Sequence, residues 1–378
     1  MEFFRPGLSI DWMKRKFLFF VLSSSVSVLG IAGMVWPGPN WGTDFSGGTE
    51  MQVTLRKNVE IAELRGAIKA LGHGNPEVVR VAGSAKRYII RVQAVSPVAP
   101  ARARTAERRL KTELGAVKLH SFRLSPGGDK LAIQLSEAVE VERLQAALEA
   151  GGLQVRGVQS FGKPEDHRYE AFLTGIGESI MAGLMEKLGA EVVPEAADRA
   201  EWVGPKAGAQ LRDAAIKSLL VAMLLMGIYI AFRFDLRFAP GALLAVLHDV
   251  AFALLAMLIF RVEVTLGTVA AVLTIVGYSI NDTIIVYDRI RENLAKIRDA
   301  DLPRTINVSV NETLGRTVNT VLTTQITVVA IIFFTVGNVR EFAITLFFGF
   351  LAGVYSSVFI ASPVTIWLDQ YVFRRQST

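Results

Sequence analysis

Six long apolar stretches constrain this chain more than any other feature of its sequence. They cover residues 17–36, 211–232, 238–260, 264–286, 318–336 and 342–368. Each is long enough to cross a lipid bilayer as one helix. The mean hydropathy of +0.37 is also high for a water-soluble domain. We therefore predict a polytopic α-helical membrane protein with six transmembrane helices, surrounded by the lipid bilayer.

Basic residues beside these stretches predict how the chain is oriented in the membrane. Three of them close the segment 1–16, directly before the first stretch, so the positive-inside rule places that segment in the cytoplasm. The basic residues of the loop 287–317 and of the closing segment 369–378 fall on the same side. A cleaved signal peptide is the alternative for the first stretch. Its length and its ending at Trp36-Pro37 favour an uncleaved anchor.

The region between the first two stretches, residues 37–210, has no window that could span a bilayer and is predicted to be an extracytoplasmic α+β domain. Two of its segments match at a shift of 80 residues, which places Val59 over Val139. Each segment has the pattern strand, amphipathic helix, strand, strand, which is typical of split βαβ units. A duplication with copies at residues 49–95 and 129–190 is one interpretation, and shared binary patterning is the other.

Two further helices are expected in this domain. The basic stretch between the copies, residues 102–111, is predicted to be a solvated helix rather than a binding patch. A helix over residues 175–188 follows the last strand of the second copy, and we assign it to that copy.

The fourth stretch contains an ionisable group at membrane depth. Asp282 lies with Asn281 inside an apolar run, and Asp288 lies at the cytoplasmic end of the same helix. A buried charge in a membrane is costly and usually faces a protein interior or a water path. Asp282 is therefore predicted to have a functional role, with Tyr278 on the same helix face one turn away.

The fifth stretch carries a polar stripe at helical spacing. Its members are Arg316, Asn319, Thr320, Thr323 and Thr324. We predict an ion pair between Arg316, at the cytoplasmic end of the stripe, and Asp282. For each threonine taken singly, a hydrogen bond back to its own helix is the preferred interpretation.

Polar and small residues in other stretches give weaker signals. His248 and Asp249 in the third stretch form a second candidate pair, either a proton relay or a helix-packing contact. Gly349 and Gly353 have the spacing that lets two membrane helices approach closely, and Gly277 is expected to act in the same way.

Composition excludes several classes of function. The chain has no cysteine, which rules out disulfides, thiolate metal sites and cysteine nucleophiles. The net charge of +6 is explained by lysines and arginines that flank the membrane, so no nucleic-acid partner is predicted. No cofactor and no metal site are predicted. An aspartyl protease needs two carboxylates on facing helices, whereas Asp282 and Asp288 lie six residues apart on one helix. We therefore do not predict an enzyme.

Three motifs, taken together, resemble the SecF family of bacterial protein export. The first is Gly42-Thr43-Asp44-Phe45-Ser46-Gly47-Gly48, and the second is Val203-Gly204-Pro205. The third is the pairing of GYSINDTIIVYDRIREN with RTVNTVLTT in the fourth and fifth stretches. Their order and spacing relative to six spans make the combination specific. The resemblance is weakest over residues 101–173, where this chain exceeds the family's usual single small α+β unit.

The resemblance implies an accessory subunit of the Sec translocase in the bacterial inner membrane, a multi-pass protein forming half of an RND-type unit. Its implied partners are SecD in a heterodimer, the SecYEG channel, YajC, the translocating preprotein and protons. The family's essential carboxylate and arginine match Asp282 and Arg316, and Asp288 matches a position at the cytoplasmic mouth. The remaining family-motif positions, expected to be structural, are Asp44, Gly47, Gly48, Gly204, Pro205 and Gly277.

A carboxylate in such a site can act as a switch. Paired with Arg316 it prefers to be ionised, and released into apolar surroundings it prefers a proton, so helix movement and protonation are coupled. Two alternatives remain open at this point: half of an RND-type proton-coupled exporter, and a non-conducting structural partner of SecD.

Overall fold

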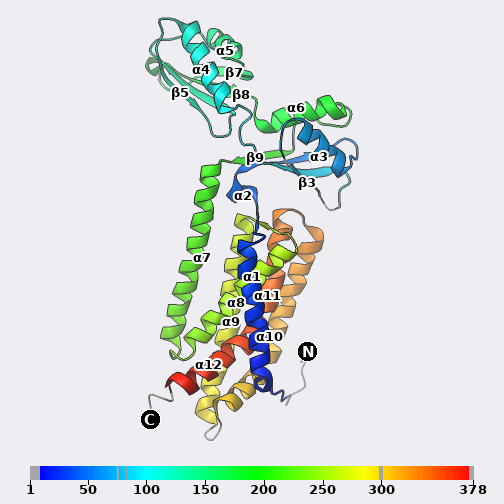
Figure 1. The fold of residues 1–378 in the computed structure, drawn as a ribbon, viewed down its shortest axis with the longest axis vertical. Helices are drawn as coiled ribbons and strands as arrows, with labels where there is room; N and C mark the ends of the chain where they lie inside the picture. Colours follow the sequence, from blue (N-terminus) through cyan, green and yellow to red (C-terminus); the bar gives the residue numbers. More distant parts are fainter. Residues whose placement is uncertain (1–8, 75, 82, 298–300, 374–378) are drawn as a thin grey trace. The chain divides into compact units, whose positions relative to one another are not determined.

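The computed structural model describes residues 9–373, apart from residues 75, 82 and 298–300. The predicted cytoplasmic ends therefore lie partly outside the described residues, including the basic pair at 374–375. The chain divides into two compact units (Figure 1). We call the one formed by the chain up to Gly42 and from Arg212 onward the helical unit, and the one formed by Thr43–Leu211 the mixed unit.

The helical unit contains the long helices of the chain. They are α1 (Lys16–Val35), α7 (Pro205–Arg233, which begins in the mixed unit), α8 (Ala239–Ile259), α9 (Leu266–Lys296), α10 (Leu302–Phe334) and α11 (Asn338–Ser356). Counted with their extensions, they give six candidate membrane spans among the described residues, which confirms the predicted architecture. A short helix, η1 (Trp12–Arg15), precedes α1. Strand β1 (Asn40–Trp41) pairs in parallel with β10 (Glu263–Val264).

The last span continues beyond α11 without leaving the helical path. Two π-helical segments, η3 (Ser357–Ala361) and η4 (Asp369–Phe373), flank α12 (Ser362–Leu368). Pro363 lacks a backbone N–H and cannot bond to a carbonyl of the preceding turn, which accounts for irregular helix at this point.

The predicted cytoplasmic loop 287–317 is instead mostly helix, because α9 runs on to Lys296 and α10 already begins at Leu302. Polar contacts between the two helices stabilise these extensions. Arg289 donates to Glu312 at 2.7 Å, and Asn293 donates to Ser309 at 3.0 Å. Asp301 caps α10 by accepting from the backbone N–H of Arg304.

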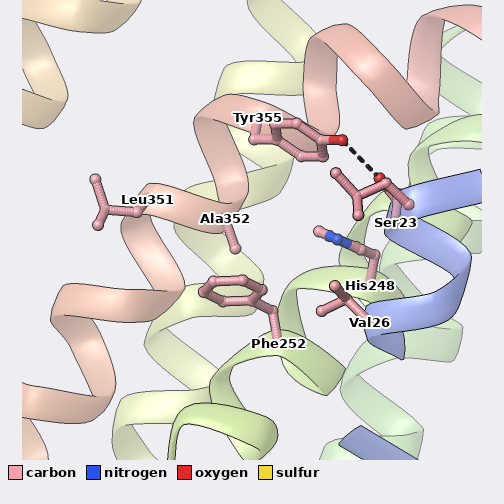
Figure 2. A pocket seen from close by; sticks show the side chains of 8 residues that line it. Ser23, Val26, His248, Phe252, Leu351, Ala352 and Tyr355 are labelled. Carbon is pink, nitrogen blue, oxygen red and sulfur yellow. Dashed lines mark hydrogen bonds between the residues drawn. The ribbon is translucent and has the colours of Figure 1, made fainter. Parts of the chain in front are cut away.

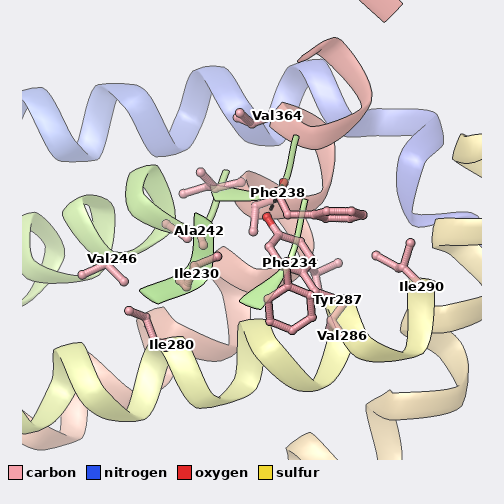
Figure 3. Packing of buried hydrophobic residues seen from close by; sticks show 14 of the residues in the cluster. Ile230, Phe234, Phe238, Ala242, Val246, Ile280, Val286, Tyr287, Ile290 and Val364 are labelled. Carbon is pink, nitrogen blue, oxygen red and sulfur yellow. Dashed lines mark hydrogen bonds between the residues drawn. The ribbon is translucent and has the colours of Figure 1, made fainter. Parts of the chain in front are cut away.

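An aromatic cluster in the core of this unit packs α9 against the link between α7 and α8 (Figure 3). Tyr287 of α9 is fully buried, with its ring 4.8 Å from that of Phe238 and 6.1 Å from that of Phe234. Its hydroxyl donates to the carbonyl of Ala361, the last residue of η3. The Tyr287 hydroxyl therefore gives this backbone carbonyl a hydrogen-bond partner, since burial of a carbonyl without one is costly in the membrane interior.

The first sheet of the mixed unit has the order β3-β4-β2-β9 and is antiparallel throughout. Its strands are β2 (Gly48–Thr54), β3 (Glu77–Arg80), β4 (Arg87–Val92) and β9 (Arg199–Val203). Helices α3 (Ile61–Ala70) and α6 (Ile176–Leu188) pack on it through one apolar core (Figure 1). We call this the host subdomain; a short helix, α2 (Thr43–Ser46), precedes it.

The second sheet has the order β5-β6-β8-β7 and is also antiparallel. Its elements are α4 (Pro100–Leu114), β5 (Leu119–Leu124), β6 (Lys130–Leu135), α5 (Val141–Ala150), β7 (Val155–Ser160), η2 (Pro164–Asp166) and β8 (Arg168–Leu173). Helices α4 and α5 share the core of this sheet. All of these elements lie between β4 and α6 of the host, so we call them the inserted subdomain.

The two subdomains repeat one arrangement. Reading the inserted sheet as β7-β8-β6-β5 matches each strand to its counterpart in β3-β4-β2-β9. The backbone N–H of Val59 donates to the hydroxyl of Tyr88, and that of Val139 donates to the hydroxyl of Tyr169. The same side-chain-to-backbone bond at equivalent positions supports a duplication over shared patterning.

The predicted limits of the second copy, residues 129–190, were wrong at both ends. Helix α6 packs into the host core, whereas the basic helix α4, which the sequence placed between the copies, buries Ala106, Leu110 and Leu114 in the inserted core. The copies differ in chain order, because α6 and β9 follow the host's other elements while α4 and β5 precede the inserted ones. A sequence match at a constant shift of 80 residues can detect only those helices and strands that follow one another in the same order in both copies.

Candidate functional site

Asp282 lies on α9 inside the helical unit and is only 1% exposed. Its Oδ1 is buried without a hydrogen-bond partner among the described residues. The charges of Arg316 and of Asp249 act on this carboxyl through space. A buried carboxyl with an unused acceptor is costly to keep in the charged form, which is the condition for a group that exchanges protons.

Helices α9 and α10 run antiparallel with a constant register near Asp282. Tyr278 bonds to Thr324 at 2.7 Å, Asn293 bonds to Ser309 at 3.0 Å, and the residue numbers of each pair sum to 602. By this register Asp282 lies level with Thr320. The polar stripe predicted on α10 is thus brought alongside the aspartate.

Arg316 does not form the predicted ion pair with Asp282. No salt bridge joins them in the described part of the chain, and the Arg316 side chain is exposed. Arg316 lies four residues from Thr320, so the register places it one helical turn from Asp282, toward the C-terminal end of α9. The arginine therefore influences the carboxyl by its charge rather than by direct contact.

The threonines of the stripe bond to their own helix, as the preferred interpretation predicted. Thr320, Thr323 and Thr324 donate to carbonyls four residues earlier, at 2.9 to 3.0 Å. Thr324 also contacts the hydroxyl of Tyr278. Their hydroxyls are satisfied locally, yet the stripe itself stays accessible, with Thr323 exposed and Thr320 half-buried.

The other residues predicted to matter on α9 and α10 are either exposed or have a buried atom without a hydrogen-bond partner. Asn281 and Gly277 on α9 are exposed, and a Cβ added at Gly277 would meet no atom of the described residues, so the close helix packing predicted at Gly277 was wrong for this chain alone. On α10, the buried Oδ1 of Asn319 has no hydrogen-bond partner among the described residues. Asp288 is exposed while Asp282 is buried, which places them on different sides of α9 and argues against a protease dyad.

His248 and Asp249 of α8 lie in a buried, hydrogen-bonded polar cluster of the helical unit. His248 Nδ1 lies 2.9 Å from Asp249 Oδ1, and both side chains are buried. Asp249 Oδ2 accepts hydrogen bonds from Ser279 of α9 and from Ser356 of α11, the latter at 2.7 Å. The two serines were missed at the level of sequence, where the only signal was a small hydroxyl residue inside an apolar run.

Small residues permit this meeting of three helices. Gly353, predicted as a packing glycine, places α11 so close to α9 that an added Cβ would lie 3.4 Å from Ser279. At Gly349 an added Cβ would lie 2.1 Å from the Ile275 side chain. Both glycines therefore act as expected for a close helix contact.

The imidazole of His248 also borders a cavity of about 290 Å³ between α1, α8 and α11 (Figure 2). Its walls are mainly apolar and include Val26, Phe252 and Leu351. Tyr355 and Ser23, whose hydroxyls lie 3.0 Å apart, supply the other polar groups. The His248 ring is therefore bonded to Asp249 on one side and open to this cavity on the other.

The motif residues of the mixed unit meet where α7 begins. Gly47 and Gly48 have positive φ angles of 74° and 138°, and a Cβ on Gly47 would lie 2.9 Å from Pro205. Gly204 directly precedes Pro205, the first residue of α7, and Asp44 lies on the neighbouring helix α2. These positions fix a tight chain crossing, which agrees with a structural role.

No group of three or more His, Asp or Glu side chains in the described ranges could hold a metal ion.

Two family models match the chain. Residues 185–371 match the model described as protein export membrane protein SecD/SecF, C-terminal, and residues 37–59 match the SecD/SecF GG motif. The inserted subdomain lies outside both matches.

Curated relatives and solved structures agree with these matches. The protein translocase subunit SecF of Gemmatimonas aurantiaca is 38% identical over 255 residues, covering 64% of this chain and 76% of that protein. The subunit of the same name from Pseudomonas aeruginosa is 36% identical, with 64% and 79% covered.

The crystal structure of SecDF from Thermus thermophilus superposes with a TM-score of 0.66 at 26% identity, covering 96% of this chain and 39% of that chain. The super-membrane-facing form of SecDF gives a TM-score of 0.52 at 25% identity, with 99% and 41% covered. This chain thus spans about two fifths of either SecDF chain.

Proposed function

The chain belongs to the SecF family of protein translocase subunits, and from this premise we propose that it uses the proton motive force, together with SecD, to promote preprotein translocation. The observation that supports proton use is Asp282, a buried carboxyl with an unpartnered oxygen on a membrane helix. No other described aspartate or glutamate in a candidate span combines deep burial with an oxygen left wholly unbonded.

The polar side of α9 and α10 supports SecD as the partner. Asn281, Arg316 and Thr323 are exposed in this chain although they lie on helices apolar enough to cross a membrane. Polar groups are costly against lipid, so this side requires a protein or water-lined surface opposite it. The SecDF chains that match are more than twice as long as this one, which leaves room for such a second half.

Asp282 and Arg316 then act as a switch without direct contact. When Asp282 is ionised, the cation one turn away attracts it, and when Asp282 takes up a proton that attraction is lost. Movement of one charge through the whole membrane potential supplies about 2.3 kcal/mol per 100 mV, enough to favour one of two helix packings. We propose that this change is transmitted to the mixed unit on the outer side.

The remaining assignments follow from the family. We propose residence in the bacterial inner membrane with both termini cytoplasmic, a complex with the SecYEG channel and YajC, and the emerging preprotein as the molecule that the mixed unit helps to move. His248 and Asp249 are proposed to support the proton pathway from the third span, with Asp288 at its cytoplasmic mouth.

Asp282→Asn tests the proposal in vesicles that contain this chain, its SecD partner and the translocon. We expect proton flux and proton-dependent stimulation of export to disappear while the amount of complex stays unchanged. Glu292→Gln is the matched control, since it removes a carboxylate from an exposed position on the same helix. Full stimulation by Asp282→Asn would contradict the proposal and favour a non-conducting structural partner of SecD. Proton-driven release of small molecules without export would favour an RND-type exporter half.

A further inference from the structure

The segment before α1 is bound to the cytoplasmic end of α10. We call residues 10–13 the N-terminal strap. Trp12 and Met13 belong to η1, and Met13 is 5% exposed and packs in the main core of the helical unit. Trp12 stacks edge-on against Phe359, with ring centroids 5.8 Å apart. The strap is therefore packed against the rest of the helical unit.

Two asparagines of α10 form hydrogen bonds with the strap. Asn307 accepts from the backbone N–H of Met13 at 3.1 Å and donates to Asp11 at 2.7 Å. Asn311 accepts from the backbone N–H of Ile10 and from the indole N–H of Trp12, at 3.2 and 3.1 Å, and donates to the Ile10 carbonyl at 2.8 Å. These are five hydrogen bonds between segments about 300 residues apart in sequence.

Helix α1, which follows the strap, is held firmly at other points. Gly30 lies so close to α8 that an added Cβ would be 2.2 Å from the Ala251 carbonyl oxygen. At its far end the chain pairs as β1 with β10, and the backbone N–H of Gly42 donates to Val264 at 3.0 Å. Directly after Gly42 the chain enters the mixed unit. α1 thus follows the strap in the chain, and residues 36–42 connect α1 to the first residue of the mixed unit.

The strap contacts α10 close to the candidate switch. Asn311 precedes Arg316 by five residues, or about 7.5 Å along the helix axis. We propose, resting on the proposed function above, that Asn307 and Asn311 are positioning residues that transmit movement of α10 to α1 and so to the mixed unit. They do not take part in proton transfer. Loss of the strap should leave proton flux intact and disconnect it from export.

A redox-controlled strap tests this directly, because the chain has no cysteine of its own. The variant combines Asp11→Cys, Asn307→Cys and Asn311→Ala, which removes all five bonds and places two thiols where side chains are in contact. It is studied as the full chain in complex with its partner, in the vesicles described above. When reduced, it should keep proton flux within about twofold of the native chain and lose export stimulation at least about fivefold. When oxidised, the disulfide replaces the hydrogen bonds and stimulation should return.

Control variants distinguish a loss of coupling between proton flux and export from a loss of folding. Variants in which either of the two cysteines is replaced by alanine still lack all the bonds between Asn307, Asn311 and the strap but cannot form the disulfide, so oxidation should not restore the coupling of proton flux to export. Asn307→Ala with Asn311→Ala provides a second, cysteine-free version that should behave like the reduced form. The inference is overturned if the reduced variant keeps full stimulation, if it loses flux and stimulation in equal proportion, or if oxidation fails to restore export.

The outcome for Asp282→Asn in the same vesicles distinguishes the two proposals. If that variant still shows proton-driven export, the proposed function fails. If it loses export while the reduced strap variant does not, only the role of the strap fails.

Discussion

Asp249 and Asp282 are two buried aspartates on neighbouring membrane helices, with opposite surroundings. Asp249 accepts from two serines, and His248 lies against its other oxygen, while Asp282 leaves an oxygen without any partner among the described residues. A carboxylate with several hydrogen bonds is held in one state, whereas one without them gains little from staying charged. We therefore expect Asp249 to stabilise the packing of three helices, besides its proposed support of the proton pathway, and Asp282 to be the carboxyl that changes its protonation.

Removal of the Asp249 carboxylate should have the largest effect on stability. Asp249→Ala leaves two serine hydroxyls and an imidazole without their acceptor inside the helix bundle, and we expect a loss of about 3 kcal/mol or more in the free energy of unfolding. Unfolding in mixed detergent micelles measures this loss. Asp235→Ala removes an exposed carboxylate from the link between α7 and α8 and should cost less than about 1 kcal/mol.

The serines that bond to Asp249 should each contribute a smaller share. Ser279→Ala and Ser356→Ala should each cost about 1.5 kcal/mol in the free energy of unfolding, since the buried carboxyl of Asp249 loses one of its hydrogen-bond donors. The double variant should differ from the sum of the two, because both hydroxyls bond to the same oxygen. Strict additivity in a double-mutant cycle would mean that the cluster is not one unit.

Asp282→Asn should barely change stability, although it is expected to abolish proton-driven export. No hydrogen bond to the carboxyl is lost, and a neutral amide is easier to bury than a charge, so the free energy of unfolding should stay within about 0.5 kcal/mol of the native value or rise. A loss as large as that of Asp249→Ala would remove the distinction between the two aspartates.

Substitutions in the polar stripe on α10 should have small effects on the free energy of unfolding. Thr323→Val removes a hydroxyl that bonds only to its own helix and should cost about 0.5 kcal/mol or less. Thr324→Val also breaks the contact with Tyr278 and should cost about 1 kcal/mol. Equal costs for the two would show that the contact between α9 and α10 adds nothing.

Hydropathy was sufficient to predict six spans, because the cost of exposing backbone and charge to lipid leaves few alternatives. The same cost singled out Asp282. Hydropathy could not show that Arg316 lies one helical turn from Asp282, because this distance depends on the register between α9 and α10. The contacts Tyr278–Thr324 and Asn293–Ser309 determine that register. Ser279 and Ser356 were not predicted, since a serine in an apolar run looks the same whether or not it faces an aspartate.

In the mixed unit, local periodicity predicted three strands of each sheet but neither β5 nor β9, and the packing partners of the elements are set by contacts distant in sequence. Helix α6 follows the inserted subdomain in the chain but buries Ile180 and Leu184 against the host sheet. No pattern within residues 176–188 distinguishes the two possible partners. The pairing of β9 with β2 in three dimensions shows that the chain after the inserted subdomain belongs to the host subdomain again.

The nested arrangement also sets an order of assembly during synthesis. The inserted subdomain is complete once residue 173 has been made, whereas the host sheet still lacks α6 and its edge strand β9, which ends at Val203. The inner copy can therefore fold while the outer copy remains open around it, as expected of units that fold as the chain emerges. Pro205 and α7 follow at once, so closure of the host coincides with arrival of the second membrane span.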